Sequence, residues 1–410
     1  MRILVVSQYF WPEGFRINEV TKSLVEKGIQ VDVLTGKPNY PEGKIFEGYR
    51  IGGCLREQYC GANISRVPLI PRGKNNRIRL ALNYLSFIVS GLVFGPWLKR
   101  GRKYDVIFVY GLSPLMLALP ALFLGWLKKV PVVIWVQDLW PQSLSATGYV
   151  RNRFILWAVE QVVRFIYRHA DLLLVQSRAF VEPVRVLASG TPIKYYPNSV
   201  DGSFAVPATG KTPDVPGLEG GFSVMFAGNI GAAQGVEVIV EAATLLKDHK
   251  DIQFVVLGDG SCRPWMLQQV KARNLKNLHL PGRFPVETMP GFMQKASALL
   301  VTLAEREIFA ATVPNKVQAY MAAGRPIIAC LPGEGARLVV EAKAGMGVRA
   351  EDGKALAEAV LGLYRMAESE RDEMGRNGRA YFHENFDHER LVDELIEELH
   401  EVVQKKESIQ

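Results

Sequence analysis

The first residues with chemical potential lie in a glycine-bearing loop near the start of the chain. Gly14 and Arg16 follow a short apolar run and precede a predicted helix that begins near Ile17. Glycine lets a ligand approach the backbone closely, and the free N–H groups at a helix N-terminus favour a negative charge. Arg16 adds a fixed positive charge. The loop is therefore a candidate anion site, although an ordinary strand-to-helix turn has the same composition.

A second loop repeats this arrangement in the other half of the chain. Residues 224–235 read Val-Met-Phe-Ala-Gly-Asn-Ile-Gly-Ala-Ala-Gln-Gly and include Asn229, Gly231 and Gln234. The spacing of the glycines does not match Gly-x-Gly-x-x-Gly, so the dinucleotide fingerprint is not met. Two further turns follow apolar runs: Gly258-Asp-Gly260, and a Pro-Gly-Arg-Phe-Pro turn that contains Arg283 and Phe284.

A lysine at the start of a predicted helix is the strongest sign of a bound anion. Pro314, Asn315 and Lys316 precede a predicted helix over residues 317–323, which we expect the segment from Thr312 to Asn315 to cap. A positive charge in the first turn is unfavourable for the helix dipole. A bound diphosphate explains Lys316 better, and a solvated surface lysine is the alternative.

Asp138 is the candidate for work on a hydroxyl group. It follows the apolar run Val132–Val136 and lies beside Trp140. A carboxylate at the carboxyl end of a buried strand faces the ligand side of the sheet and can orient or deprotonate an acceptor hydroxyl. A helix N-cap or an arginine partner is the alternative role.

Other kinds of site are not indicated. The chain has no Asp-x-Asp, His-Glu-x-x-His or Gly-x-Ser-x-Gly motif, so neither a metal-dependent nucleotide site nor a serine hydrolase is predicted. Four cysteines without a Cys-x-x-Cys pair predict neither a zinc site nor a disulfide scaffold. We expect no metal ligands.

The elements that position these residues alternate between strands and helices. Apolar runs that are short and rich in Val, Ile and Leu predict parallel strands buried on both faces. In the first half these lie at residues 3–7, 31–35, 106–110, 132–136 and 172–176, and in the second at residues 223–227, 253–257, 278–280, 298–301 and 327–329. Residues 201–221 are rich in Pro and Gly and predict a linker. The last predicted helix, 388–404, carries Leu391, Leu395, Leu399 and Val402 on one face.

Composition and charge support two domains with different surfaces. The 410 residues are 48% hydrophobic and 22% charged, which excludes a mostly disordered chain. Residues 1–200 hold 26 Lys and Arg against 12 Asp and Glu, whereas residues 201–410 hold 23 against 29. No nucleic-acid-reading motif is present, so the basic half is expected to meet a phosphorylated substrate or an anionic membrane, and no nucleic acid.

Two uncharged stretches are long enough to span a bilayer. Residues 106–127 divide into a strand, a turn and a helix too short to span. Residues 80–98 are flanked by basic residues and allow three interpretations: a buried helix, a helix in the membrane interface, or a true span. Near Arg2 only a short apolar run follows, so no secretory signal is expected.

Taken together, these motifs resemble the family-4 retaining glycosyltransferases. The resemblance covers the whole chain: the N-terminal Pro/Gly loop, residues 197–201, 227–231 and 258–260, and residues 314–316 leading into 320–326 as a single motif. The run Asp138-Leu-Trp-Pro141 is similar to the bacterial O-antigen and colanic acid branch of WbuB-like L-fucosamine transferases. Each motif is weak alone, but five in the same order are a specific signal.

The resemblance implies the GT-B fold, an α/β architecture of two facing Rossmann-like, doubly wound domains. Residues 1–200 would form the acceptor-binding, membrane-facing domain, residues 201–385 the nucleotide-sugar domain, and residues 386–410 a helix that crosses back to the first domain. Asp138 and Lys316 would be catalytic. The implied donor-binding residues are Gly14, Arg16, Asn229, Gly231, Gln234, Gly258, Gly260, Arg283, Phe284, Pro314 and Asn315.

The implied reaction moves a sugar, with retained configuration and without a metal cofactor, from a nucleotide-sugar donor. A UDP-linked N-acetylated deoxyhexose such as L-FucNAc is favoured, and the acceptor would be a polyprenyl-diphosphate-linked saccharide at the cytoplasmic face of the inner membrane. The departing diphosphate would take the acceptor proton.

The sequence departs from the family pattern at its two glutamates, whose places hold Ala311 and Ala319. Asn229 and Gln234 stand where many members have Arg and Lys. Two alternatives remain open: a nucleotide-sugar epimerase on the same architecture, and a non-catalytic membrane-bound assembly partner.

Overall fold

The computed structural model describes residues 1–408 except 75, 147–149, 151, 201–203 and 205–211. The chain divides into two compact units. Unit 1 comprises Met1–Pro197 with Glu389–Gln410, and unit 2 comprises Asn198–His388. The chain therefore returns to unit 1 for its last helix. The boundaries expected from the sequence were after residues 200 and 385.

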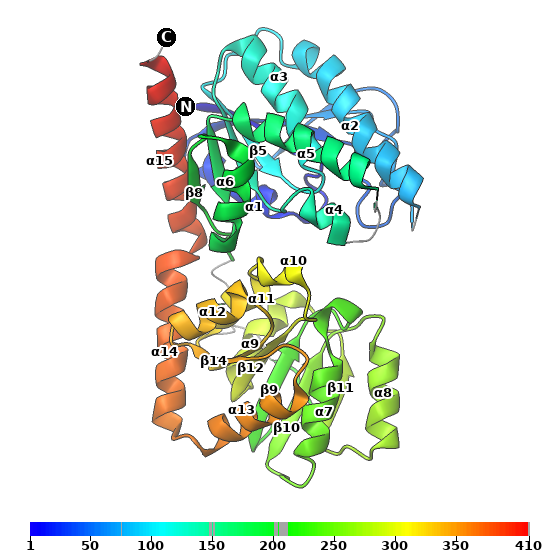
Figure 1. The fold of residues 1–410 in the computed structure, drawn as a ribbon, viewed down its shortest axis with the longest axis vertical. Coiled ribbons are helices and arrows are strands. Elements are labelled where there is room, and N and C mark those ends of the chain that lie inside the picture. The colour runs from blue at the N-terminus through cyan, green and yellow to red at the C-terminus, as the bar shows by residue number, and fades with distance from the viewer. Residues whose placement is uncertain (75, 147–149, 151, 201–203, 205–211, 409–410) are drawn as a thin grey trace. The chain divides into compact units, whose positions relative to one another are not determined.

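Unit 1 is built on an eight-stranded sheet (Figure 1). The strands follow the order β3-β4-β2-β1-β5-β6-β7-β8, and all neighbours are parallel except β3 and β4. The strand bounds are β1 Arg2–Val6, β2 Gln30–Gly36, β3 Leu55–Tyr59, β4 Ala62–Val67, β5 Val106–Gly111, β6 Val132–Val136, β7 Leu172–Val175 and β8 Ile193–Tyr195. Strands β2 and β4 lie on one side of β1, and strands β5 to β8 lie on the other side. The strand order therefore reverses between β1 and β5, which is the switch point of the sheet.

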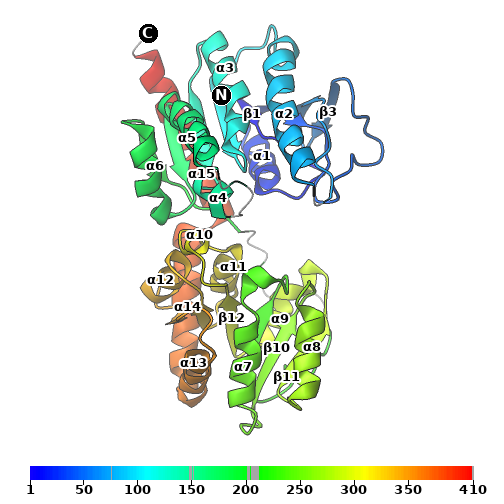
Figure 2. The same ribbon diagram turned by 45° about the vertical axis from the view of Figure 1, so that its right-hand side comes forward.

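Helices cover both faces of this sheet (Figures 1 and 2). They are α1 Arg16–Glu26, α2 Arg77–Leu98, η1 Leu115–Ala118, α3 Leu119–Lys128, α4 Gln142–Ala146, α5 Arg153–Arg168, η2 Arg178–Phe180, α6 Val181–Ala188 and α15 His388–Glu407. Helix α15 contributes Leu391, Leu395 and Leu399 to the same core cluster as α1 and the strands. The Tyr196 hydroxyl also donates to the Leu391 carbonyl (2.8 Å). The amphipathic face predicted for this helix is thus its packing face.

Unit 2 contains a six-stranded parallel sheet in the order β11-β10-β9-β12-β13-β14. Its strands are β9 Phe222–Ala227, β10 Ile252–Leu257, β11 Leu278–Gly282, β12 Ala298–Thr302, β13 Ile327–Cys330 and β14 Gly345–Val348. Its helices are η4 Ala232–Gln234, α7 Glu237–Leu245, α8 Arg263–Ala272, η5 Val286–Thr288, α9 Met289–Lys295, α10 Glu307–Ala310, α11 Asn315–Ala323, α12 Glu334–Glu341, α13 Gly353–Arg365 and α14 Glu368–Asn385. The order is that of a doubly wound Rossmann sheet, with its switch point between β9 and β12.

The structure bears on three sequence-based expectations. Of the three interpretations left open for residues 80–98, a fully buried helix does not hold, because only 22% of an 18-residue apolar window of α2 is buried. The N-cap of α11 is Pro314, inside the segment 312–315 that was expected to cap the helix, but it makes no side-chain hydrogen bond. Residues 201–203 and 205–211 of the predicted linker lie outside the described residues, but Val215 and Leu218 are buried in the core of unit 2. That part of the segment belongs to the fold.

Helix α2 is long and apolar enough to cross a membrane by length and composition. Residues 106–127 form β5, η1 and α3, as expected.

Candidate functional site

Three loops in unit 2 are held together by backbone hydrogen bonds at the carboxyl ends of neighbouring strands. Gly228, after β9, donates to the Leu257 carbonyl (2.8 Å), and Gly258, after β10, donates to the Gly282 carbonyl (2.8 Å). A Cβ on Gly258 would lie 1.8 Å from the Gly228 carbonyl oxygen, and Gly258 has a φ of +141°. Only glycine fits this position, and the loops can therefore approach one another closely.

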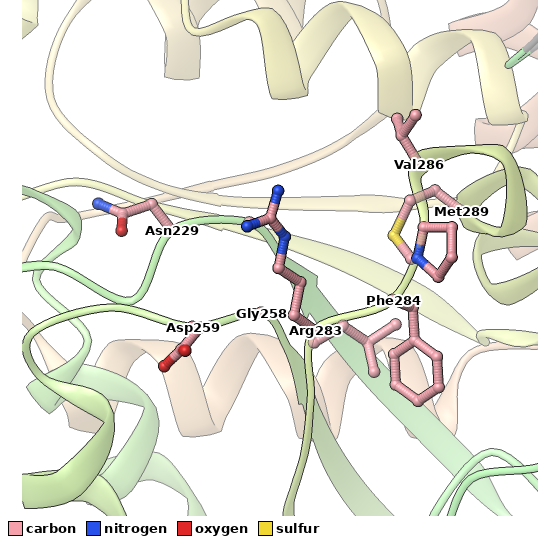
Figure 3. Close-up of a pocket in the computed structure, with 10 residues that line it drawn as sticks. Asn229, Gly258, Asp259, Arg283, Phe284, Val286 and Met289 are labelled. Atoms are coloured by element: carbon pink, nitrogen blue, oxygen red, sulfur yellow. The ribbon is translucent and has the colours of Figure 1, made fainter. Parts of the chain in front are cut away.

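These loops line a cavity of about 780 Å³. Its walls come from Gly228 and Asn229 after β9, from Gly258 and Asp259 after β10, and from the loop of Arg283 and Phe284 after β11. Figure 3 shows the Arg283 side chain rising from its loop into the space between Asn229 and Met289. The volume suits a nucleotide-sized ligand.

Lys316 lies beside the same glycine loop. Its Nζ donates to Gln234 Oε1 (2.8 Å) and sits 3.8 Å from the centroid of the Phe226 ring. A Cβ on Gly228 would approach Lys316 Cε to 2.6 Å, so this glycine makes room for the lysine. Burial lowers the pKa of Lys316 to about 7. An amine held against an aromatic ring without a carboxylate partner among the described residues is well prepared to receive an anion.

The N-terminus of α11 strengthens this anion site. Its first turn has no acidic residue, and its N-cap makes no side-chain hydrogen bond. The N–H groups of the first turn are therefore left without a capping side chain, at the positive end of the helix dipole. Pro314 and Asn315 open this turn next to Lys316, so the three residues singled out from the sequence lie together. Gly231, the N-cap of η4, lies against the Asn229 side chain.

Gly14, Arg16 and Asp138 belong to unit 1. A Cβ on Gly14 would meet nothing within 4 Å, so its backbone faces open space. Arg16 opens α1 and contacts Glu19 at 3.5 Å, while its Nε is buried without a hydrogen-bond partner among the described residues. A buried guanidinium nitrogen without a partner is costly unless a ligand satisfies it.

Asp138 follows β6, one strand from the switch point. Its Oδ2 accepts a hydrogen bond from Ser113 Oγ (2.7 Å), and Ser113 Oγ in turn accepts one from Trp140 Nε1 (2.9 Å). Burial raises the pKa of the Asp138 carboxyl, which the Ser113 hydrogen bond partly offsets. The charges of Arg16 and Asp138 both act on buried Tyr110 at the end of β5. The two residues therefore share one edge of the sheet.

Sequence reasoning missed several of these residues. Ser113 was not singled out, nor were Asp259, Val286 and Met289 of the unit 2 cavity. Each of the first two directly follows a strand of a parallel sheet, which is the position where such folds bind ligands. That rule was available from the sequence.

The chain was compared with known protein families and structures. Residues 14–199 match the family model described as glycosyl transferase 4-like domain, and residues 221–366 match the one described as glycosyl transferases group 1. The chain is a glycosyltransferase.

Two bacterial relatives support this conclusion. The transferase is 29% identical to the probable glycosyltransferase WbjE of Pseudomonas aeruginosa, over 70% of this chain and 73% of the relative. It is 24% identical to the putative colanic acid biosynthesis glycosyl transferase WcaI of Escherichia coli, over 79% of this chain and 82% of the relative.

Solved structures establish the fold as GT-B. Sucrose-phosphate synthase from Thermosynechococcus elongatus aligns with a TM-score of 0.73 at 16% identity, covering 98% of this chain and 99% of the other. Anabaena HepE in complex with UDP aligns with a TM-score of 0.69 at 14% identity, covering 98% of this chain and 100% of the other. The fold class inferred from the sequence is confirmed.

Proposed function

We propose that this transferase moves an N-acetylated deoxyhexose such as L-FucNAc from a UDP-linked donor to a polyprenyl-diphosphate-linked saccharide, with retention of configuration. It would act in cell-surface polysaccharide synthesis at the cytoplasmic face of the inner membrane. The observation that carries the proposal is Lys316, a cation seated between the Gly228 loop and the uncapped N-terminus of α11. This arrangement suits a diphosphate.

The remaining donor contacts follow from the unit 2 cavity. Phe284 and Met289 offer apolar surface to a base, and Arg283 offers a guanidinium to the diphosphate. Ala311 and Ala319 supply no carboxylate. Asp259, which also accepts a hydrogen bond from its neighbour Gly260 (2.8 Å), is a carboxylate of the cavity wall that can receive ribose or sugar hydroxyls.

In the reaction, a bond forms between an acceptor oxygen and the anomeric carbon while the bond from that carbon to the diphosphate breaks. The acceptor proton passes to the departing diphosphate on the same face of the sugar, so no enzyme nucleophile is needed. Lys316, Arg283 and the α11 N-terminus stabilise the charge that develops on the leaving group. Asp138, held by Ser113, orients the acceptor hydroxyl.

Support for the biological setting comes from the relatives and from the surface of unit 1. The name of WcaI places that protein in colanic acid synthesis, and HepE was solved with UDP bound. The apolar, basic-flanked helix α2 suits an enzyme whose acceptor is anchored in a membrane. An epimerase acting on a soluble nucleotide sugar has no need of such a helix.

The test is direct transfer by the purified full-length chain. A synthetic polyprenyl-diphosphate saccharide and a panel of UDP- and GDP-sugars are supplied, with and without EDTA. We expect a glycosylated lipid with the anomeric configuration of the donor, at a rate that EDTA leaves unchanged. Donor turnover without an acceptor would indicate the epimerase instead, and no product from any donor would overturn the proposal.

A further inference from the structure

Three helices of unit 1 lie together on one face of its sheet. From β4 through β5 and β6 to β7, each step moves in the same direction along the sheet. Because crossovers between parallel strands are right-handed, α2, α3 and α5 must fall on the same face. Figures 1 and 2 show them grouped there, and α1 and α15 share a core cluster that none of these three helices joins.

Helix α2 packs against the unit through one narrow face that includes Phe87 and Leu98, and many of its other large apolar side chains are exposed. Gly91 and Gly95 are buried, and a Cβ on Gly91 would approach Pro120 Cγ of α3 to 2.8 Å. In contrast, Val93 is 62% exposed and Trp97 is 61% exposed. A helix that meets water on its outer face would show the reverse pattern, so this face is suited to an apolar medium.

The apolar surface continues over the two neighbouring helices. Trp126 on α3 is 73% exposed, and Phe154 and Trp157 on α5 are also exposed. The three helices carry six Lys and Arg but only one acidic residue, Glu160, which pairs with Arg164 (2.8 Å). Exposed tryptophans with basic neighbours and almost no acidic residues complement an anionic lipid surface.

A groove of about 680 Å³ opens among these helices. Its apolar part is lined by Leu92 of α2, Leu122 and Trp126 of α3 and Phe165 of α5. One end is polar and contains Lys129, His169 and the ion pair between Lys406 and Asp171 (2.8 Å). The Nδ1 of His169 lies 2.8 Å from the Phe165 carbonyl, to which it must donate, so Nε2 is the ring nitrogen turned to other partners.

This groove is separate from the residues assigned to the reaction. It also reaches Val130 and Val132, at the amino end of β6, whereas Asp138 follows the carboxyl end of that strand. The groove is apolar along most of its lining, and the two lysines at its polar end outnumber the single carboxylate of Asp171. This combination suits an amphiphile that carries a phosphate group. Neither a nucleotide nor a saccharide offers an apolar chain of this kind.

We propose that the groove binds one acyl chain of an anionic phospholipid with its phosphate at Lys129 and His169, and that the α2–α3–α5 face lies in the bilayer interface. This inference rests on the proposed function, since it names the surface by which the enzyme reaches a lipid-linked acceptor. Helix α2 is also tied to the reactive edge of the sheet, because buried Asn83 accepts a hydrogen bond from Gln8 Nε2 (2.8 Å). This hydrogen bond connects the docked face directly to the loop that follows β1.

The first test is flotation of the full-length protein with vesicles of phosphatidylcholine alone or mixed with phosphatidylglycerol. We expect binding to the mixed vesicles and a loss of about tenfold or more in the double variant Val93→Ser/Trp126→Ser, because two exposed apolar side chains no longer enter the interface. The matched control is Leu245→Ser/Val340→Ser, which removes two exposed apolar side chains from unit 2. Equal binding of the two double variants would overturn the proposal.

The second test addresses the groove itself. A phosphatidylglycerol with a diazirine at the end of its chain is photolysed with the protein, and the labelled peptides are mapped. We expect labels on the segments of Leu92, Leu122 and Phe165, and a several-fold loss of labelling in Lys129→Gln but not in Lys271→Gln, an exposed lysine of unit 2. Labels confined to the outer face of α2, or equal labelling of the two variants, would contradict the binding of an acyl chain in the groove.

UDP binding is measured on the same samples without vesicles. Intact UDP binding with no vesicle binding defeats this inference alone, whereas vesicle binding without UDP binding defeats the proposed function alone.

Discussion

At the scale of single residues, Asp138 and Lys316 share an unusual feature: each is an ionisable group held where its charged form is disfavoured. Burial raises the pKa of Asp138 and lowers that of Lys316 to about 7. Natural chains retain such groups mainly where a ligand needs them. In the proposed reaction, the Asp138 carboxylate orients the acceptor hydroxyl and the Lys316 ammonium binds the diphosphate.

Replacing Asp138 by Asn is expected to lower kcat by about a hundredfold or more with little change in KM, because the side chain keeps its shape but loses its charge. Protonation of Asp138 at low pH has the same effect, so the wild-type rate should fall as the pH drops through its raised pKa. Steady-state rates across pH provide the measurement. The acid limb should be absent in Asp138→Asn and present in Asp248→Asn, a change at an exposed loop. If Asp138→Asn turned over at the wild-type rate, Asp138 would have no role in catalysis.

Lys316 makes a prediction about stability in the absence of ligand. Its pKa is about 7 in the folded protein and near 10.5 in the unfolded chain, so the unfolded chain binds more protons between these pH values. Stability should therefore rise with pH from about 7 to 10.5 through this group. Lys316→Met should melt at a higher temperature than wild type at pH 7, and the difference should shrink toward pH 10. Calorimetry without nucleotide measures both. If Lys316→Met were less stable than wild type at pH 7, the buried amine would not destabilise the folded protein, and the prediction would be wrong.

At the scale of elements, the sequence predicted the strands that carry the site but missed four others. The runs of β1, β5, β6, β9 and β12 are mostly apolar because these strands are covered on both faces. Strand β3 is an edge strand with alternating exposure, and β14 reads Gly-Met-Gly-Val, so neither has that signal. Strand β4 carries Arg66, which is fully buried through contacts with Glu57 and the Gly36 carbonyl. These contacts, which make the burial of a charged side chain possible, come from other strands and cannot be read from the sequence of β4 alone.

The candidate site was predicted in the same uneven way. Gly228, Gly258 and Lys316 were visible because glycine turns after strands and a lysine in a first helical turn are locally unusual. Ser113 could have been considered because it follows a strand, but its contact with Asp138 depends on β5 and β6 becoming neighbours. Met289 lies in a helix, and its place in the cavity wall has no local signal. The position of α2 stayed open between three interpretations for a related reason: its length and hydropathy do not say which side chains face outward.

Helix α2 gives the element-scale prediction. Gly91→Leu should destabilise unit 1 by about 2–4 kcal/mol, because the new side chain meets Pro120 at the closest approach of α2 and α3. Val89→Ser on the exposed face should change stability by only about 0.5 kcal/mol or less. Denaturant unfolding distinguishes the two. Equal effects would mean that α2 does not pack through its glycines.

At the scale of the whole molecule, the chain leaves unit 1, builds unit 2 and returns through α15. The last helix completes the core of unit 1, with ion pairs from Lys27 to Asp393 (2.8 Å) and from Lys406 to Asp171 (2.8 Å) at its flanks. The stability of unit 1 thus depends on residues synthesised after all of unit 2.

Leu395→Asp should therefore unfold unit 1 while sparing unit 2, because a charge is placed in a fully buried position. In scanning calorimetry, the unfolding transition of unit 2, whose midpoint temperature UDP raises, should persist. The midpoint temperature of the unit 1 transition should drop by many degrees, or that transition should disappear. Glu397→Ala, at an exposed position of the same helix, is the control. Loss of both transitions together would show that the units do not unfold separately.

The central claim is that Lys316 and the loops around it hold the diphosphate of a nucleotide sugar. Titration calorimetry of the full-length protein with UDP, UMP and uridine tests it most directly. The account predicts that UDP binds more tightly than UMP and far more tightly than uridine. It also predicts that Lys316→Gln lowers the affinity for UDP by about tenfold to a hundredfold and changes the affinity for uridine little. If UDP and uridine bind alike, or if Lys316→Gln binds UDP as wild type does, the account is contradicted.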